Sequence, residues 1–248
     1  MMVAMAIAGV LAFMELCRRS VGIPILCVVG ALLVYTFANV RFGKVVYDLF
    51  YTTTGLMNTP INVCAKYIVV FIIFGSFLER TGISAFFIDL ANGFAGASAG
   101  GPAKVAVISS ALCGMVSGSS VGNTVTTGSV TIPMMKRTGY KPEFAGAVEA
   151  AASTGGQIMP PIMGAAAFLM AEYMGIPYAQ VALKAILPAV LYFTGIYIAV
   201  HMEAKKLGLK GIPKDELPKM RKLLPKIYLL LPLIVLVVLV STNMYTMQ

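Results

Sequence analysis

Residues 116–133 read VSGSSVGNTVTTGSVTIP, and this stretch decides how the chain folds. Between Ser117 and Thr131 it carries eight hydroxyl side chains, one amide and three glycines, although long apolar runs flank it. A backbone so rich in polar groups cannot face lipid, because each unsatisfied group there costs several kcal/mol. In a membrane protein, such a stretch is tolerated only where protein covers it or where it lines a wet cavity.

The composition places the chain in a membrane. Of its 248 residues, 58% are hydrophobic and 12% are charged, and the mean hydropathy is +0.86. A soluble domain is about 45–50% apolar and about 25% charged. A soluble globular protein, a disordered chain, collagen and a secreted disulfide scaffold are therefore excluded, and an all-α polytopic membrane protein is predicted. The four cysteines form no CxxC pair and are interpreted as small buried hydrophobic residues: Cys17, Cys27, Cys64 and Cys113.

Positive charge is concentrated in one segment. The net charge is +9, and eight of the nineteen Lys and Arg residues lie between 205 and 226. Such clusters in the loops of membrane proteins mark the cytoplasmic side. A nucleic-acid-binding surface is the alternative, but no basic fold with interleaved aromatic residues accompanies the cluster. We therefore expect the lipid bilayer, and no nucleic acid, as a partner.

Five apolar runs approach the roughly 20 residues that a helix needs to cross the bilayer. They are residues 1–17, 21–38, 61–78, 180–201 and 223–240, and two longer irregular stretches cover 103–135 and 143–174. We divide the chain into residues 1–17, scaffold and interfacial segments at 20–102, a transport-type region at 103–175, and final helices at 176–248 with a basic cytoplasmic loop at 203–226.

The positive residues predict a re-entrant hairpin. With Arg18, Arg19 and the 204–226 loop inside, a single crossing by 103–135 would put the basic residues at 136–141 outside. If 103–135 enters the bilayer and turns back, every basic loop except 41–60 lies on the cytoplasmic side. The alternative is two ordinary short spans, but each arm offers only about 15 residues, too few to cross.

A second polar break follows the hairpin. Residues 154–161 read TGGQIMPP, where two prolines after paired glycines interrupt the helical hydrogen bonds. We expect freed carbonyl groups near 156–158 and Gln157 at mid-depth. At the hairpin tip, carbonyl groups ending the first arm suit a small hard cation, and N–H groups beginning the second arm suit an anion. The alternatives are close helix packing through small residues at the tip, and a simple proline kink at the break.

One carboxylate falls inside an apolar helix. Glu149 lies in an Ala-rich segment, and an intramembrane carboxylate is a candidate functional residue. It could equally pair with Lys141 or Lys184 near the interface. The sequence contains no recognisable Ser-His-Asp set and no HExxH, Walker A or GxSxG motif, so no enzyme activity is predicted.

Two blocks carry a family resemblance. Residues 114–140, GMVSGSSVGNTVTTGSVTIPMMKRTGY, and residues 150–161, AAASTGGQIMPP, resemble the large membrane subunit of TRAP (tripartite ATP-independent periplasmic) transporters. The GNTVTTG and QIMPP forms resemble the TAXI branch, in which the small and large membrane subunits are often fused. The resemblance covers nearly the whole chain. It implies that residues 1–17 end the small-subunit part and that 20–248 form the first half of the large part.

The resemblance implies the permease of a Na⁺-coupled secondary transporter in a bacterial inner membrane. Such a permease takes an organic anion, such as a carboxylate, from a periplasmic substrate-binding protein, and no organic cofactor is expected. Carried over onto this sequence, Na⁺ ligands would come from Ser117, Gly118, Ser119, Ser120 and Asn123. Substrate contacts would come from Thr124, Thr126, Thr127, Gly156, Gln157 and Pro160.

The family is built as an inverted repeat with a hairpin in each half, and we expect this chain to hold only the first half. A site at the repeat interface needs both halves, so this part alone should not transport. The remaining small-subunit and second-half segments are implied partners. Two other functions stay open from the residues: another ion-coupled anion symporter family, and a structural or assembly subunit whose small residues only pack helices.

Overall fold

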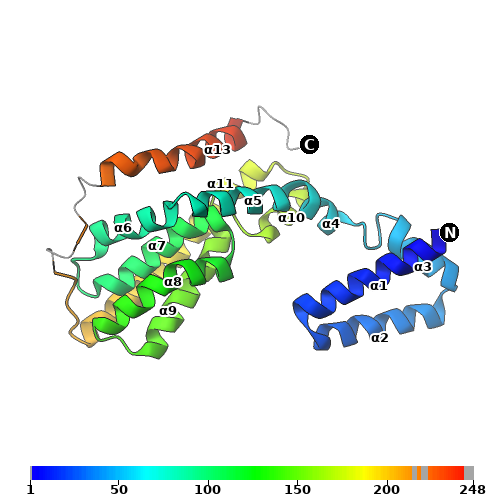
Figure 1. Ribbon diagram of the computed structural model, residues 1–248, viewed down its shortest axis with the longest axis horizontal. Helices are drawn as coiled ribbons and strands as arrows, with labels where there is room; N and C mark the ends of the chain where they lie inside the picture. Colours follow the sequence, from blue (N-terminus) through cyan, green and yellow to red (C-terminus); the bar gives the residue numbers. More distant parts are fainter. Residues whose placement is uncertain (1, 214–216, 219–222, 243–248) are drawn as a thin grey trace. The chain divides into compact units, whose positions relative to one another are not determined.

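The computed structural model describes residues 2–213, 217–218 and 223–242. Within these ranges the regular structure is helical and contains no strand, which confirms the all-α prediction (Figure 1). The chain divides into two compact units, residues 1–65 and 66–248. The predicted basic loop at 203–226 and the end of the chain lie partly outside the described residues.

The first unit is a small group of helices in which the second and third pack on the first. Its helices are α1 (Met2–Val21), α2 (Ile23–Asn39), α3 (Phe42–Tyr51) and α4 (Thr59–Val63). Helix α1 contacts both α2 and α3, and the ring of Phe50 on α3 lies directly against Gly9. Helix α2 contacts α1 and α3 but buries none of its residues, so most of its apolar surface is left uncovered within the described chain.

The second unit contains the segments that the sequence marks as irregular. After the π-helical turn η1 (Cys64–Ile68), its elements are α5 (Val69–Arg80), α6 (Ile83–Ala95), α7 (Gly101–Ser117), α8 (Ser120–Arg137), α9 (Pro142–Gly155), η2 (Gly156–Ile158), α10 (Ala165–Met174), α11 (Tyr178–Lys206), η4 (Leu224–Leu230) and α13 (Leu231–Thr242).

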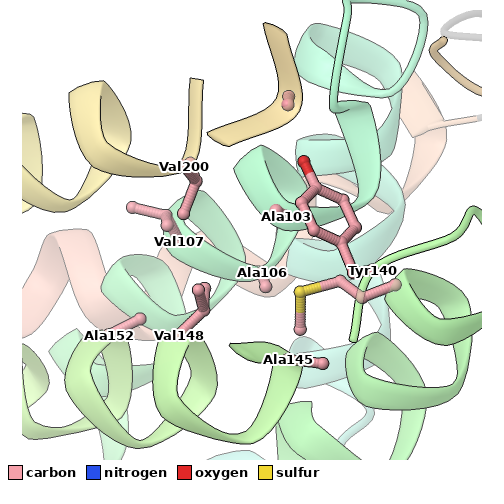
Figure 2. Close-up of a cluster of buried hydrophobic side chains, with 10 residues drawn as sticks. Ala103, Ala106, Val107, Tyr140, Ala145, Val148, Ala152 and Val200 are labelled. Atoms are coloured by element: carbon pink, nitrogen blue, oxygen red, sulfur yellow. The ribbon is translucent and has the colours of Figure 1, made fainter. Parts of the chain in front are cut away.

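Helix α7 is the centre of this unit. It packs against α5, α6, α8, α9 and α11, and twelve of its seventeen residues are buried. Alanines make this close packing possible, because small side chains let helix backbones approach. Figure 2 shows Ala106 and Val107 of α7 lying between Val148 and Ala152 of α9 on one side and Val200 of α11 on the other.

The two arms of the predicted hairpin are the antiparallel helices α7 and α8, joined through Gly118 and Ser119. Their bases meet at the other end, where the Tyr140 hydroxyl donates to the Gly100 carbonyl at 3.4 Å. Nearby, the buried Lys104 ammonium donates to Ser98 Oγ at 3.2 Å. The hairpin is therefore closed at both the tip and the base.

The arms are longer than the sequence analysis expected. They contain 17 and 18 residues, or about 26 Å of helix each, instead of about 15 residues. The reason is that α8 continues through Pro133 to Arg137 rather than ending at the proline. The length argument against two short spans is therefore weaker than expected, since 17 residues is the lower limit for a spanning helix.

Helix α8 is amphipathic, but it buries its polar face and exposes its apolar face. Its polar residues Asn123, Thr127 and Thr131 are at most 1% exposed, whereas Val121 and Val125 are 73% and 68% exposed. Water would favour the opposite arrangement, and lipid favours this one, because buried polar groups find partners while apolar side chains contact hydrocarbon. Asn123, Thr127 and Thr131 of the polar stretch therefore face protein, as predicted, whereas Ser119 and Ser129 are exposed.

Among the described residues, two helical stretches are long and apolar enough to cross a membrane, Thr59–Arg80 and Tyr178–Lys206. The other predicted runs correspond to helices that are shorter or contain several charges. The cysteine interpretation was wrong for most of the four: Cys113 is buried, but Cys17 is only half-buried, and Cys27 and Cys64 are exposed. Their helices pack too little against protein to cover them.

Candidate functional site

The tip of the hairpin is a turn that requires glycine. Helix α7 ends at Ser117, and Gly118 follows with φ of +59°, a left-handed conformation that glycine adopts without a Cβ penalty. Ser119 then caps α8, and its Oγ accepts a hydrogen bond from the Gly122 N–H at 3.2 Å. The two helix ends therefore face the same small volume, with carbonyl groups from one and N–H groups from the other.

The predicted break lies against this tip. Helix α9 ends at Gly155, and the chain is non-helical from Met159 to Gly164 before α10 begins. The Ile162 N–H donates to the Met115 carbonyl at 3.2 Å, and Gln157 Nε2 donates to Ser120 Oγ at 3.0 Å. The two polar segments, far apart in sequence, thus form one cluster rather than two unrelated kinks.

Two glycines set the closeness of this contact. A Cβ built on Gly114 of α7 would lie 2.4 Å from the Gly156 Cα, and one built on Gly156 would lie 2.8 Å from the Gly114 Cα. Real Cβ atoms do not approach another backbone so closely. The backbone of the break therefore reaches α7 only because both positions lack side chains.

Two buried oxygens in the cluster have no hydrogen-bond partner. They are Ser117 Oγ and Asn123 Oδ1. The Asn123 amide is oriented by its Nδ2, which donates to the Ser110 carbonyl at 2.8 Å and leaves the oxygen free. An unsatisfied buried acceptor costs about 1–3 kcal/mol, and such a cost in a folded protein calls for an explanation such as a bound ion.

The predicted cation ligands are brought together at the tip, but they differ in what is already bound to them. Ser117 and Asn123 carry the free oxygens, whereas Ser119 Oγ and Ser120 Oγ each accept one hydrogen bond. At Gly118, a Cβ would lie 2.8 Å from the Met163 carbonyl oxygen. In the described ranges, no three His, Cys, Asp or Glu side chains are grouped to hold a metal ion, so a cation here would depend on neutral oxygens.

The predicted substrate residues fall in three places. Gln157 is exposed beside the tip. Thr124 and Thr126 are half-buried on α8, and the Thr124 hydroxyl donates to the Ser120 carbonyl of its own helix at 2.8 Å. Thr127 is fully buried among protein groups, so it has no open face in this arrangement. Their substrate roles stay predictions.

Gly156 and Pro160 lie in the break itself. Gly156 is buried against α7, and Pro160 lines a cavity of about 280 Å³ between the break, α11 and α13. The other residues that line this cavity are apolar: Met115, Met159, Pro161, Ala179, Ala182, Leu183, Ile186, Val190 and Val237. An apolar lining offers no polar group to an anion. The substrate roles of Gly156 and Pro160 stay predictions.

Glu149 has partners that the sequence analysis missed. Its side chain is 0% exposed, and Oε1 accepts hydrogen bonds from Ser110 and Ser153, both at 3.0 Å, and from Thr127. Oε2 accepts from Thr131. Pairing with a lysine was therefore wrong, because the carboxylate lies inside the bundle rather than near an interface. The four-residue spacings Thr127–Thr131 and Glu149–Ser153 could have indicated shared helix faces.

Comparison with known proteins places the chain in context. A family model described as "Tripartite ATP-independent periplasmic transporter, DctM component" matches residues 8–247. A C4-dicarboxylate TRAP transporter large permease protein DctM from Rhodobacter capsulatus is 31% identical over 160 residues, covering 64% of this chain and 34% of that protein. The protein of the same name from Pseudomonas aeruginosa is 26% identical over 147 residues, covering 59% and 34%.

A third relative extends the match along the chain. The isethionate TRAP transporter permease protein DctMQ from Oleidesulfovibrio alaskensis is 27% identical over 195 residues, which cover 79% of this chain and 30% of that protein. The matched part thus spans about a third of the length of these relatives.

Proposed function

This chain belongs to the DctM component family of tripartite ATP-independent periplasmic transporters, and we propose that it forms the first half of a Na⁺-coupled permease. The permease is a secondary transporter in a bacterial inner membrane and imports an organic anion delivered by a periplasmic substrate-binding protein. The observation that carries the proposal is the pair of unpartnered buried oxygens at the tip, Ser117 Oγ and Asn123 Oδ1. Ser117 is the last residue of α7 and Asn123 lies in the first turn of α8, and helix ends of this kind suit an ion-binding site.

The proposed partners are the other parts of the same transporter. The matched part spans about a third of the relatives' length. We propose that a second half with its own hairpin completes the substrate site. We assign the chain to the fused TAXI branch, with residues 1–17 as the end of the small-subunit part. A match to the DctMQ relative over 79% of this chain supports a permease of that general kind.

The proposed Na⁺ site uses neutral oxygens. A hard cation prefers oxygen ligands, and the tip offers Ser117 Oγ and Asn123 Oδ1 beside the left-handed turn at Gly118. Binding a cation there relieves the cost of two unsatisfied acceptors. It also neutralises the carbonyl end of α7, which carries partial negative charge. The site therefore gains more from a cation than from water alone.

Replacing Asn123 with alanine tests this site. We expect the affinity of the purified complete permease for radioactive Na⁺ to fall at least about tenfold, because one ligand of a small coordination shell is lost. The matched control is Ser129→Ala on the same helix, where the hydroxyl donates only to the Thr126 carbonyl. This control should bind Na⁺ like the unmodified protein. Equal affinity in both variants would favour a packing role for the tip.

The proposed substrate is a small organic anion. The N-terminus of the 18-residue α8 carries partial positive charge, and exposed Gln157 lies beside it. The named relatives act with C4-dicarboxylate and with isethionate, a carboxylate class and a sulfonate. We propose a carboxylate, approached by Thr124, Thr126 and Gln157, with discrimination between anions supplied by the second half.

The proposed topology has both ends of the hairpin on the cytoplasmic face. Single cysteines placed at the exposed positions Ala97 and Lys136, in a cysteine-free background, should react with an impermeant maleimide from the same side of the membrane. A cysteine at exposed Glu172 should react from the opposite side. Labelling of Ala97→Cys and Lys136→Cys from opposite faces would contradict the hairpin.

A further inference from the structure

Glu149 is a buried carboxylate without a basic partner. It is 0% exposed, and no ion pair to it exists within the described residues. A charge so deep in a membrane protein is expensive unless donors surround it. Here the donors are hydroxyl groups from three helices: Ser110 on α7, Thr127 and Thr131 on α8, and Ser153 on α9.

Two of these hydroxyl residues, Ser110 and Thr127, also contact Asn123. The Ser110 carbonyl accepts a hydrogen bond from Asn123 Nδ2 at 2.8 Å, and the Thr127 hydroxyl lies 2.8 Å from the Asn123 carbonyl. Ser110 Oγ and Thr127 Oγ1 are 3.1 Å apart. Ser110 and Thr127 therefore touch Glu149 on one side and Asn123 on the other, and all four residues are at most 1% exposed.

The charge of Glu149 decides where the single proton of the Thr127 hydroxyl is donated. A hydroxyl has one proton, so Thr127 can donate either to Glu149 Oε1 or to the Asn123 carbonyl, but not to both. A carboxylate is the stronger acceptor, since charge-assisted hydrogen bonds are about twice as strong as neutral ones. The charge thus sets the direction of the whole network. A glutamine in its place would donate from one side and reverse part of it.

We propose that Glu149 is a positioning residue for the cation site at the hairpin tip. It fixes the hydroxyl groups of Ser110 and Thr127. The Ser110 carbonyl accepts from Asn123 Nδ2 and leaves Asn123 Oδ1 free, and Thr127 Oγ1 lies against the main-chain carbonyl of Asn123. Glu149 contacts Thr127, which follows Asn123 by one turn of α8, and a carboxylate at that place favours a monovalent cation at the tip. This inference rests on the proposed function, because it assigns to Glu149 a part in binding the same ion.

The test is Na⁺ binding by Glu149→Gln in the purified complete permease. We expect the dissociation constant for radioactive Na⁺ to rise about tenfold. The control is Glu143→Gln, which removes an exposed carboxylate from the first turn of the same helix and should leave binding unchanged. Ser153→Ala, which removes a donor that contacts only Glu149, should have a smaller effect than Ser110→Ala.

A double-mutant cycle tests whether Glu149 changes the Na⁺ affinity through Asn123 or independently of it. If Glu149 acts through Asn123, then Glu149→Gln should change Na⁺ affinity much less in an Asn123→Ala background than in the unmodified protein. If Glu149→Gln does not fold, the near-isosteric Thr127→Val gives the same comparison, because it removes the hydroxyl that bridges Glu149 and Asn123.

The Na⁺-binding results distinguish failure of this inference from failure of the proposed function. Absence of Na⁺ binding in the unmodified permease would overturn the proposed function. Normal Na⁺ binding in both the unmodified protein and Glu149→Gln would overturn this inference alone. A lower melting temperature of Glu149→Gln with unchanged Na⁺ affinity would also overturn it, because the carboxylate would then serve only the packing of α7, α8 and α9.

Discussion

Replacing Gly114 or Gly156 with alanine is expected to destabilise the protein by about 3 kcal/mol. At each position the new methyl group would meet backbone of the other segment, with the Cβ on Gly114 only 2.4 Å from the Gly156 Cα. A backbone cannot swing away as a flexible side chain can. Alanine is otherwise more favourable than glycine in a helix by about 1 kcal/mol. The net destabilisation is therefore the cost of the clash minus that gain. The break would separate from the hairpin tip, and Na⁺ binding should be lost with it.

The matched control for this pair is Gly146→Ala on α9. A Cβ at Gly146 meets nothing within 4 Å, so this variant should be unchanged or stabilised by up to about 1 kcal/mol. Unfolding of the purified protein can be followed by circular dichroism, since the chain contains no tryptophan. Equal melting temperatures for Gly114→Ala and Gly146→Ala would mean that the two segments do not approach as described.

Replacing Gly118 with alanine is the second change with a large expected effect. An L-residue in the left-handed conformation costs about 1–2 kcal/mol, and the added Cβ would lie 2.8 Å from the Met163 carbonyl oxygen and 3.1 Å from that of Ile162. We expect a loss of about 2–4 kcal/mol in stability. Because the turn carries the proposed ligands, Na⁺ affinity should fall at least about tenfold.

A control at Gly175 separates the cost of the left-handed conformation from the cost of the clash with the break. Gly175 ends α10 with φ of +62°, close to the +59° of Gly118, but a Cβ there meets nothing within 4 Å. Gly175→Ala should therefore show only the conformational cost of about 1–2 kcal/mol and normal Na⁺ binding. If Gly118→Ala and Gly175→Ala behaved alike in both measurements, contact between the tip and the break would be unimportant.

The inverted amphipathicity of α8 links the fold to its surroundings. The helix exposes valines and buries Asn123, Thr127 and Thr131. In water the exposed apolar face would favour aggregation. In lipid the same face is the favourable one, and the buried polar face finds hydrogen-bond partners inside the bundle. Asn123, one of the polar residues on the buried face of α8, is thus also a ligand of the proposed Na⁺ site.

The amino-acid sequence by itself determined the elements of the site. Eight hydroxyls and three glycines between Ser117 and Thr131 predict a covered hairpin, because their backbone and side chains cannot face lipid. The Pro160–Pro161 pair predicts the break, because proline donates no N–H and clashes with the preceding turn. Both predictions follow from local rules, and the structure has a helix–turn–helix and a helix break at these places.

Only the tertiary structure decided which residues meet. Glu149 bonds to Ser110 and Thr127, which are 39 and 22 residues away, and Gly114 touches Gly156. Periodicity shows which residues share one face of a helix, but not which helix packs against that face or at what depth. The freedom of Asn123 Oδ1 likewise depends on what its Nδ2 finds on α7. Hydrogen bonds between helices depend on atoms placed within about 0.5 Å, and that placement is fixed only when the whole bundle packs.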